Sequence, residues 1–355
     1  MKRAFHLFLM LATGVLFTGC ASKPKSGPAT GEAAGSPSPI DRVKQLSPET
    51  KEKVLALDPD YLEDKEAMEL ISQLPAPHVI CIHGGLLRVK SSMNSFADFL
   101  IGMGYPLDSI RHPGNGEFAY GHYDDSAEIA GTIAWYYEHD GLRPMIVGHS
   151  LGGIMAVRVL YEFTGSSETP FPVWNPVTGS AENRFDIVDP LTGTNRPGVG
   201  LKTPYASAAL AGGMGRILPG EWDMNDKLRE IPDSVEDFTG YQKGFDMAGG
   251  DFMGYGSGND YHATGTAQVR NVRLPSLGAH WTIPYTKGLL EDEEALDWID
   301  QYEPQPADDE TSESDPEFGL DSAKVLWAAD VWFSVRRHWV LELQRLVRAQ
   351  SESSK

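Results

Sequence analysis

Short apolar runs alternate with amphipathic spacings through the middle of the chain. Runs rich in β-branched or apolar residues predict strands at 78–82, 108–113, 145–147, 205–213, around Thr239 and at 269–277. Between them, apolar residues three and four positions apart predict helices at 96–103, 129–137, 154–161 and 289–299. Such alternation favours an α/β fold with a doubly wound, mostly parallel sheet.

Three segments outside this alternation have their own patterns. Residues 163–202 are rich in Pro, Gly, Thr and Asn with little periodicity, which is typical of a functional loop or lid rather than a linker. Residues 303–320 form an acidic linker. Residues 321–349 predict an amphipathic C-terminal helix, whose apolar face either packs on the domain or meets a membrane or partner.

The N-terminus resembles a processing signal. Two basic residues precede an apolar run at 4–17, which is too short to span a bilayer, so residues 1–19 are predicted to be a signal peptide. The string "LFTGC" resembles a bacterial lipobox, which implies a lipidated Cys20, a flexible tether at 20–40 and export to a membrane, with the outer membrane favoured. The alternative is an ordinary secretory signal that is cleaved nearby.

Composition narrows the class of protein and its partners. Hydrophobic residues make up 41% of the chain and charged residues 23%, as in a globular protein. A formal net charge of −20 repels phosphate backbones, which argues against nucleic acid as a partner. A lipidated Cys20 leaves Cys81 without a disulfide partner, and Cys81 is predicted to be a buried, inert thiol.

The strongest chemical signal is the string "GHSLG". Gly148, His149, Ser150, Leu151 and Gly152 match G-x-S-x-G between a predicted strand and a predicted helix. That context is typical of a nucleophile elbow, in which the turn exposes the serine hydroxyl and the helix N-terminus favours negative charge. The alternative is a glycine-rich structural turn.

A second glycine pair follows an earlier strand. His83, Gly84 and Gly85 come directly after the run at 78–82. Acyl transfer requires two backbone N–H groups that converge on the developing oxyanion, and glycine lets such groups point inward. We expect one donor at Leu151 and the other at Gly85 or Leu86.

The strings "HVICIHGG" and "PMIVGHSLGG" resemble the lipase and esterase branch of the α/β-hydrolase superfamily, over residues 77–302. The resemblance implies a catalytic domain at 41–302, the chain order Ser, acid, His, and Ser150 as the nucleophile. It also implies that the His149 side chain points away. Little strand-like sequence precedes Val79, which is similar to the compact bacterial lipases.

The resemblance places the base after the last strand and the acid after the one before it. His280 occupies the first loop and is the predicted base; His262 is the alternative, and His338 is assigned to a helix surface. Asp246 and Asp251 both fit the acid, with Asp246 preferred because it directly follows the strand-like residues.

These patterns predict a serine hydrolase that cleaves carboxylic esters, with acyl lipids favoured as substrates, through an acyl-enzyme. An acyltransferase or thioesterase on the same triad, or a non-catalytic lipoprotein that uses the scaffold for binding, are the alternatives. No cofactor or metal is implied, since the histidines and aspartates of 112–125 match no metal-site spacing and the Gly-rich run 249–258 lacks a phosphate-loop lysine. The oligomeric state stays open.

Overall fold

A sheet of six parallel strands forms the centre of the molecule. In the computed structural model its strands are β1 (Val79–His83), β2 (Tyr120–Gly121), β3 (Met145–His149), β8 (Thr203–Ala209), β10 (Val235–Lys243) and β12 (Gln268–Leu274). They lie in the order β12-β10-β8-β3-β1-β2, and every neighbouring pair is parallel. The predicted α/β fold with a parallel sheet is confirmed.

The structure describes residues 37–62, 65–85, 87–166, 169–212, 224, 226–244, 246, 249, 259–304 and 317–353, with the backbone alone at 87–89 and 353. All of these belong to one compact unit that spans Gly31–Lys355. The predicted signal peptide, Cys20, Leu86, Asp251 and most of the acidic linker lie outside the described residues.

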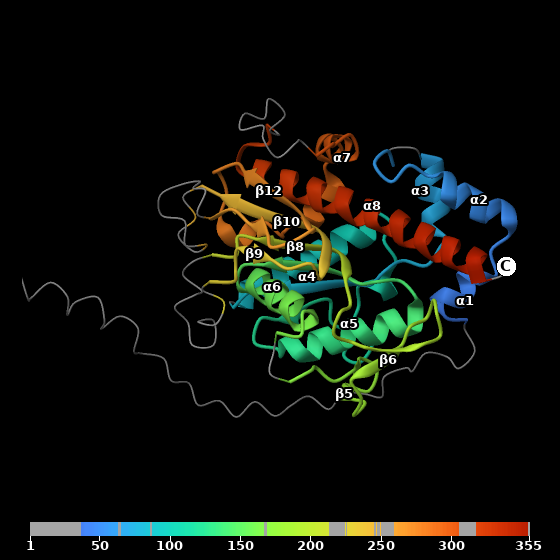
Figure 1. Cartoon of the computed structure of the whole chain (residues 1–355). Helices are drawn as coiled ribbons and strands as arrows, with labels where there is room; N and C mark the ends of the chain where they lie inside the picture. The colour runs from blue at the N-terminus through green and yellow to red at the C-terminus, as the bar shows by residue number, and fades with distance from the viewer. Residues whose placement is uncertain are drawn as a thin grey trace, which may run out of the picture. The chain divides into compact units, whose positions relative to one another are not determined.

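Helices cover both faces of the sheet (Figure 1). They are α1 (Pro39–Lys44), α2 (Pro48–Ala56), α3 (Lys65–Ser72), α4 (Leu87–Gly102), α5 (Ser126–Asp140), α6 (Leu151–Phe163), α7 (Glu293–Asp300) and α8 (Ser322–Ser353). Alternate strand residues point to opposite faces, so Val79 and Cys81 join a buried cluster with α4 and α8, whereas Ile80 and Ile82 join another with α5 and α6. The sheet is therefore doubly wound, as predicted.

The C-terminal helix packs against the domain. Its apolar positions Val325, Trp332, Trp339, Leu343 and Leu346 are all buried. The packing alternative for this helix is therefore the correct one. None of the described helices has both the length and the apolar character needed to cross a bilayer.

One predicted strand is wrong. Residues 108–113 form no strand, and a 3-10 helix, η1 (Leu107–Ser109), occupies the start of this region. Its backbone hydrogen bonds are local: the N–H groups of Ile110 and Arg111 both donate to the Leu107 carbonyl. The edge strand is instead β2, which is only two residues long. Because the N–H groups of Ile110 and Arg111 are used in local turn bonds, they are not available to pair with a neighbouring strand.

The insertion at 163–202, described except for 167–168, forms two small hairpins: β4 (Trp174–Asn175) with β5 (Ser180–Ala181), and β6 (Asp186–Val188) with β7 (Asn195–Pro197). Side-chain bonds attach it to α5 and join Trp135 to Glu182, Glu138 to Arg184 and Tyr137 to Asp189. Its predicted role as a lid stays a prediction. A further short parallel pair is β9 (Glu230–Ile231) with β11 (His262–Ala263).

The close contact between α6 and the sheet depends on Gly152. A Cβ there would lie 2.2 Å from the carbonyl oxygen of Ile82, a backbone atom that does not move easily. We expect Gly152→Ala to lower the free energy of unfolding by about 1–3 kcal/mol, because α6 must shift from the sheet. Urea denaturation measures this loss. Gly288→Ala, where nothing lies within 4 Å of the new Cβ, is the matched control, and equal midpoints for the two variants would contradict the prediction.

Candidate active site

The predicted catalytic residues follow three strands that end at the same edge of the sheet. Ser150 follows β3, Asp246 follows β10 and His280 follows β12. The chain leaves β1 toward β2 on one side and leaves β3 toward β8 on the other, so the winding direction reverses between these two central neighbours. In open parallel sheets, ligand sites form outside the carboxyl ends of the strands at such a reversal.

Asp246 and His280 are bonded to each other. Nδ1 of His280 lies 2.6 Å from Oδ2 of Asp246, and the two side chains are 7% and 4% exposed. An ionised carboxylate only accepts hydrogen bonds, so Nδ1 carries the proton and Nε2 of the neutral ring is left as the basic nitrogen. This is the tautomer that a general base facing a serine requires.

The Asp246 carboxyl group is ionised at neutral pH. Burial by itself raises the pKa of Asp246, but the hydrogen bond and charge of His280, together with the backbone N–H of Gly249, lower it below its usual range. The buried carboxylate can therefore stabilise a positive charge on His280 without taking up a proton.

Ser150 has a strained backbone. Its φ of 59° and ψ of −128° lie in a region that side chains rarely enter. Two hydrogen bonds maintain this conformation, from the Ser150 N–H to the Ala209 carbonyl at 2.8 Å and from the Gly153 N–H to the Ser150 carbonyl at 2.9 Å. Strain of this kind is concentrated at functional sites and is expected of a serine at a strand-to-helix elbow.

The glycines around Ser150 allow its close surroundings. A Cβ on Gly84 would lie 2.8 Å from Cβ and 3.0 Å from Oγ of Ser150. A Cβ on Gly148 would lie 2.4 Å from the Gly152 carbonyl oxygen. The loop after β1 therefore approaches Ser150, and the start of α6 approaches the end of β3, at distances that only glycine permits.

The loop after β1 has a fixed peptide orientation at Gly85. Nδ1 of His83 donates a hydrogen bond to the Gly84 carbonyl at 2.7 Å. In a trans peptide the N–H points opposite to the carbonyl, so the Gly85 N–H faces away from the His83 ring. A Cβ on Gly85 would lie 2.9 Å from Cδ1 of Leu151, so the loop after β1 packs against the side chain of the residue that follows Ser150. Leu86, the other predicted donor of this loop, lies outside the described residues.

His149 contacts the backbone of the predicted base. The resemblance assigns this residue only to the elbow, with its side chain pointing away, whereas the structure places its Nε2 3.1 Å from the His280 carbonyl oxygen. The two imidazole rings have centroids 5.0 Å apart. Burial, reinforced by the neighbouring His280, lowers the pKa of His149 to about 3, so the ring is uncharged at neutral pH.

His122 is a second histidine whose place the sequence did not indicate. It is 3% exposed, and neither ring nitrogen has a hydrogen-bond partner among the described residues. Its Cε1 and Nε2 would lie 3.1 and 3.3 Å from a Cβ on Gly85. Burial, and then the nearby His83, lower the pKa of His122. No spacing in the sequence relates position 122 to position 85, so only the fold brings them together.

The other histidines lie elsewhere. His262 is exposed in β11. His338 lies in α8 and is 2% exposed, with Nε2 3.0 Å from Oδ2 of Asp237 and Nδ1 2.7 Å from the Ser334 carbonyl. The surface role predicted for His338 is therefore wrong: the ring is buried, and hydrogen bonds to Asp237 of the sheet and to the Ser334 carbonyl satisfy its two nitrogens.

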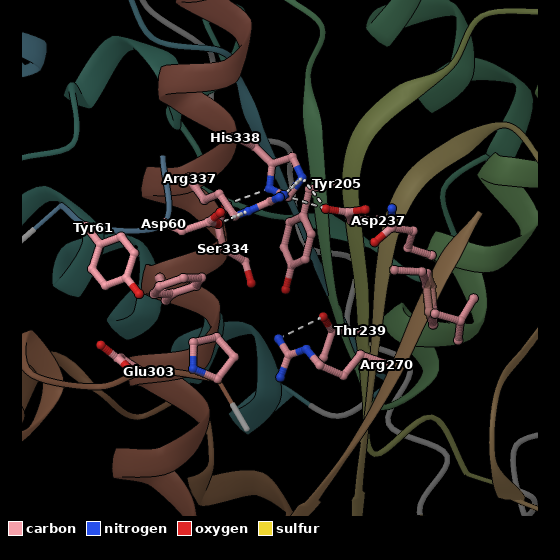
Figure 2. A pocket seen from close by; sticks show the side chains of 15 residues that line it. Asp60, Tyr61, Tyr205, Asp237, Thr239, Arg270, Glu303, Ser334, Arg337 and His338 are labelled. Carbon is pink, nitrogen blue, oxygen red and sulfur yellow. Dashed lines mark hydrogen bonds and ion pairs between the residues drawn. The ribbon is translucent and has the colours of Figure 1, made fainter. Parts of the chain in front are cut away.

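A cavity of about 410 Å³ lies toward the other end of the strands, where β8, β10 and β12 begin. Figure 2 shows the side chains that line it. It is lined by residues from the amino-terminal parts of β8, β10 and β12 and from α8, among them Tyr205 and Thr239. Both of its arginines are paired: Arg337 with Asp60 and Asp237, and Arg270 with the neighbouring Asp330. This cavity is distant from the carboxyl edge that carries Ser150.

In comparisons with known proteins, no family model, no curated protein and no solved structure matches this chain. Among the described side chains, no group of three or more His, Cys, Asp or Glu residues gathers as in a metal site. The side chains at the carboxyl edge of the sheet are therefore the basis for assigning a function.

Proposed function

We propose that this protein is a serine hydrolase of carboxylic esters, with Ser150 as nucleophile, His280 as general base and Asp246 as the residue that orients and stabilises His280. The observation that supports this most strongly is the 2.6 Å bond between Nδ1 of His280 and the buried Asp246 carboxylate. It lies at the same sheet edge as the strained Ser150. A serine hydroxyl is a weak nucleophile until such an oriented base takes its proton.

In the proposed reaction, Oγ of Ser150 attacks the acyl carbonyl carbon while its proton passes to Nε2 of His280. The N–H groups of Leu151 and Gly85 stabilise the oxyanion. The bond from carbon to the leaving oxygen breaks, and the imidazolium gives its proton to the departing alcohol. Water then attacks the acyl carbon and loses a proton to His280; the bond from the acyl carbon to Oγ breaks, His280 returns the proton to Oγ, and the acid leaves.

The surroundings of His280 favour an apolar acyl group. Leu277 and Trp281 flank the base in the chain and are 56% and 42% exposed, so each offers apolar surface beside it. The net charge of −20 disfavours anionic substrates. The N-terminal sequence supports export and a lipid anchor at Cys20, which would hold the enzyme close to acyl lipids.

A series of nitrophenyl esters, from acetyl to palmitoyl, tests the proposal with the full-length protein in detergent. We expect hydrolysis with a preference among chain lengths, and a fluorophosphonate probe bound covalently to the peptide that contains Ser150. Product formed from an added alcohol instead of water would identify the acyltransferase alternative. If the protein shows no turnover and no labelling, the proposed hydrolase is contradicted and the binding lipoprotein is favoured.

A further inference from the structure

The loop that carries His280 is attached to the ends of two strands. Nζ of Lys243, the last residue of β10, donates to the Gly278 carbonyl at 2.5 Å. Nε2 of His149, the last residue of β3, lies 3.1 Å from the carbonyl oxygen of His280 itself. Side chains at the ends of β10 and β3 therefore hold the backbone of this loop in place, independently of the bond between the His280 ring and Asp246.

The hydrogen bond between His149 and His280 has a definite direction. A carbonyl oxygen only accepts, so Nε2 of His149 carries the proton and donates it. The ring is fully buried, and its Nδ1 has no hydrogen-bond partner within the described part of the chain. Among the described residues, the His280 carbonyl is therefore the hydrogen-bond partner of this buried ring, and the bond to it determines the tautomer of His149.

We infer that His149 is a positioning residue, which ties the base loop to the nucleophile elbow. The inference rests on the proposed function. Ser150 is the next residue in the chain and is itself held by its bond to Ala209. The hydrogen bond from His149 therefore fixes the position of the His280 backbone relative to the backbone of Ser150. Displacement of reacting groups by about 1 Å costs about 100-fold in rate, so such a link has a measurable effect.

The uncharged state of His149 suits this role. During catalysis the His280 ring becomes an imidazolium, and the His149 ring centroid is 5.0 Å from it. A second positive charge at this distance would oppose proton transfer to His280, whereas a neutral donor does not. The buried position of His149 thus supplies a hydrogen bond without a competing charge.

The test compares His149→Leu with His149→Gln. Leucine removes the donor, whereas the glutamine amide can place an N–H near the position of Nε2. We expect kcat for a nitrophenyl ester, and the rate of fluorophosphonate labelling, to fall about 10- to 100-fold in His149→Leu with KM within about twofold. His149→Gln should recover most of this loss. A residue that only fills space would show no such recovery.

Hydrogen exchange of the peptide 278–283 gives a readout that does not depend on activity. It should exchange faster in His149→Leu than in the wild type or in His149→Gln. His338→Gln is the matched control, because His338 is also buried and bonds a backbone carbonyl but lies at the other edge of the sheet; it should leave both kcat and this peptide unchanged.

The outcomes separate the inference from the proposed function. Unchanged exchange and unchanged labelling in a folded His149→Leu would overturn the positioning role while the hydrolase stands. Equal losses in both variants, with melting temperatures like the wild type, would overturn the hydrogen bond as the link. A wild type that neither labels nor hydrolyses, but whose base loop loosens in His149→Leu alone, would remove the proposed function and retain the link.

Discussion

Ser150→Ala is expected to lower kcat for ester hydrolysis about a million-fold and to abolish fluorophosphonate labelling. The variant lacks the oxygen that attacks the ester and forms the acyl-enzyme. Alanine has the same backbone preferences as serine at a φ of 59°, so the strain of the elbow is unchanged. The melting temperature should therefore stay near that of the wild type.

Ser207→Ala is the matched control for this prediction. Ser207 is fully buried in β8, beside β3, and its hydroxyl has no hydrogen-bond partner among the described residues. Removal of that oxygen should leave kcat and labelling unchanged. If Ser150→Ala still labels with one probe per chain, another residue is the nucleophile and the elbow is a structural turn.

Asp246→Asn is expected to lower kcat by about four orders of magnitude with little change in KM. An asparagine amide presents N–H donors as well as an oxygen, so it can favour the tautomer of His280 in which Nε2 is protonated and no longer basic. The amide also lacks the charge that stabilises the imidazolium. Both effects act on the transition state rather than on binding of the ester, which is why kcat carries the loss.

Asp237→Asn is the matched control for Asp246→Asn, because Asp237 also bonds a buried histidine but lies near the end of the sheet where the strands begin. Oδ2 of Asp237 lies 3.0 Å from Nε2 of His338. This variant should lose stability but retain kcat per labelled molecule. The other acid considered from the sequence, Asp251, lies outside the described residues, and Asp251→Asn is expected to retain activity. A loss in Asp251→Asn with none in Asp246→Asn would exchange their roles.

The α/β architecture could be predicted from local sequence patterns because the pattern of apolar residues reflects which faces of each element are buried. Val79 and Cys81 face one cluster and Ile80 and Ile82 the other, so a strand buried on both sides shows as an unbroken apolar run. Cys81 is buried, and burial raises the pKa of its thiol to about 12, as an inert core cysteine requires. Where burial gave no pattern, prediction failed: the edge strand is two residues long, and 108–113 is not part of it.

The candidate site divides in the same way. The sequence alone determined which residue has the elbow context, since Ser150 and its glycines are neighbours in the chain and their spacing is itself the motif. It also limited the base and acid to a few positions after the last strands. It left Asp246 and Asp251 open, because loop conformation and not spacing decides which carboxylate reaches an imidazole 34 residues further along.

Only the tertiary structure decided the contacts between segments. The bond of Asp246 to His280, the His149 donor on the base loop and the burial of His122 against Gly85 all join residues that are distant in sequence. His338 illustrates the same limit, since its position in the helix indicates a surface, whereas the structure buries it and bonds it to Asp237. Local propensity and periodicity carry information about which face of an element is apolar, whereas hydrogen bonds between elements depend on how those elements are placed in space.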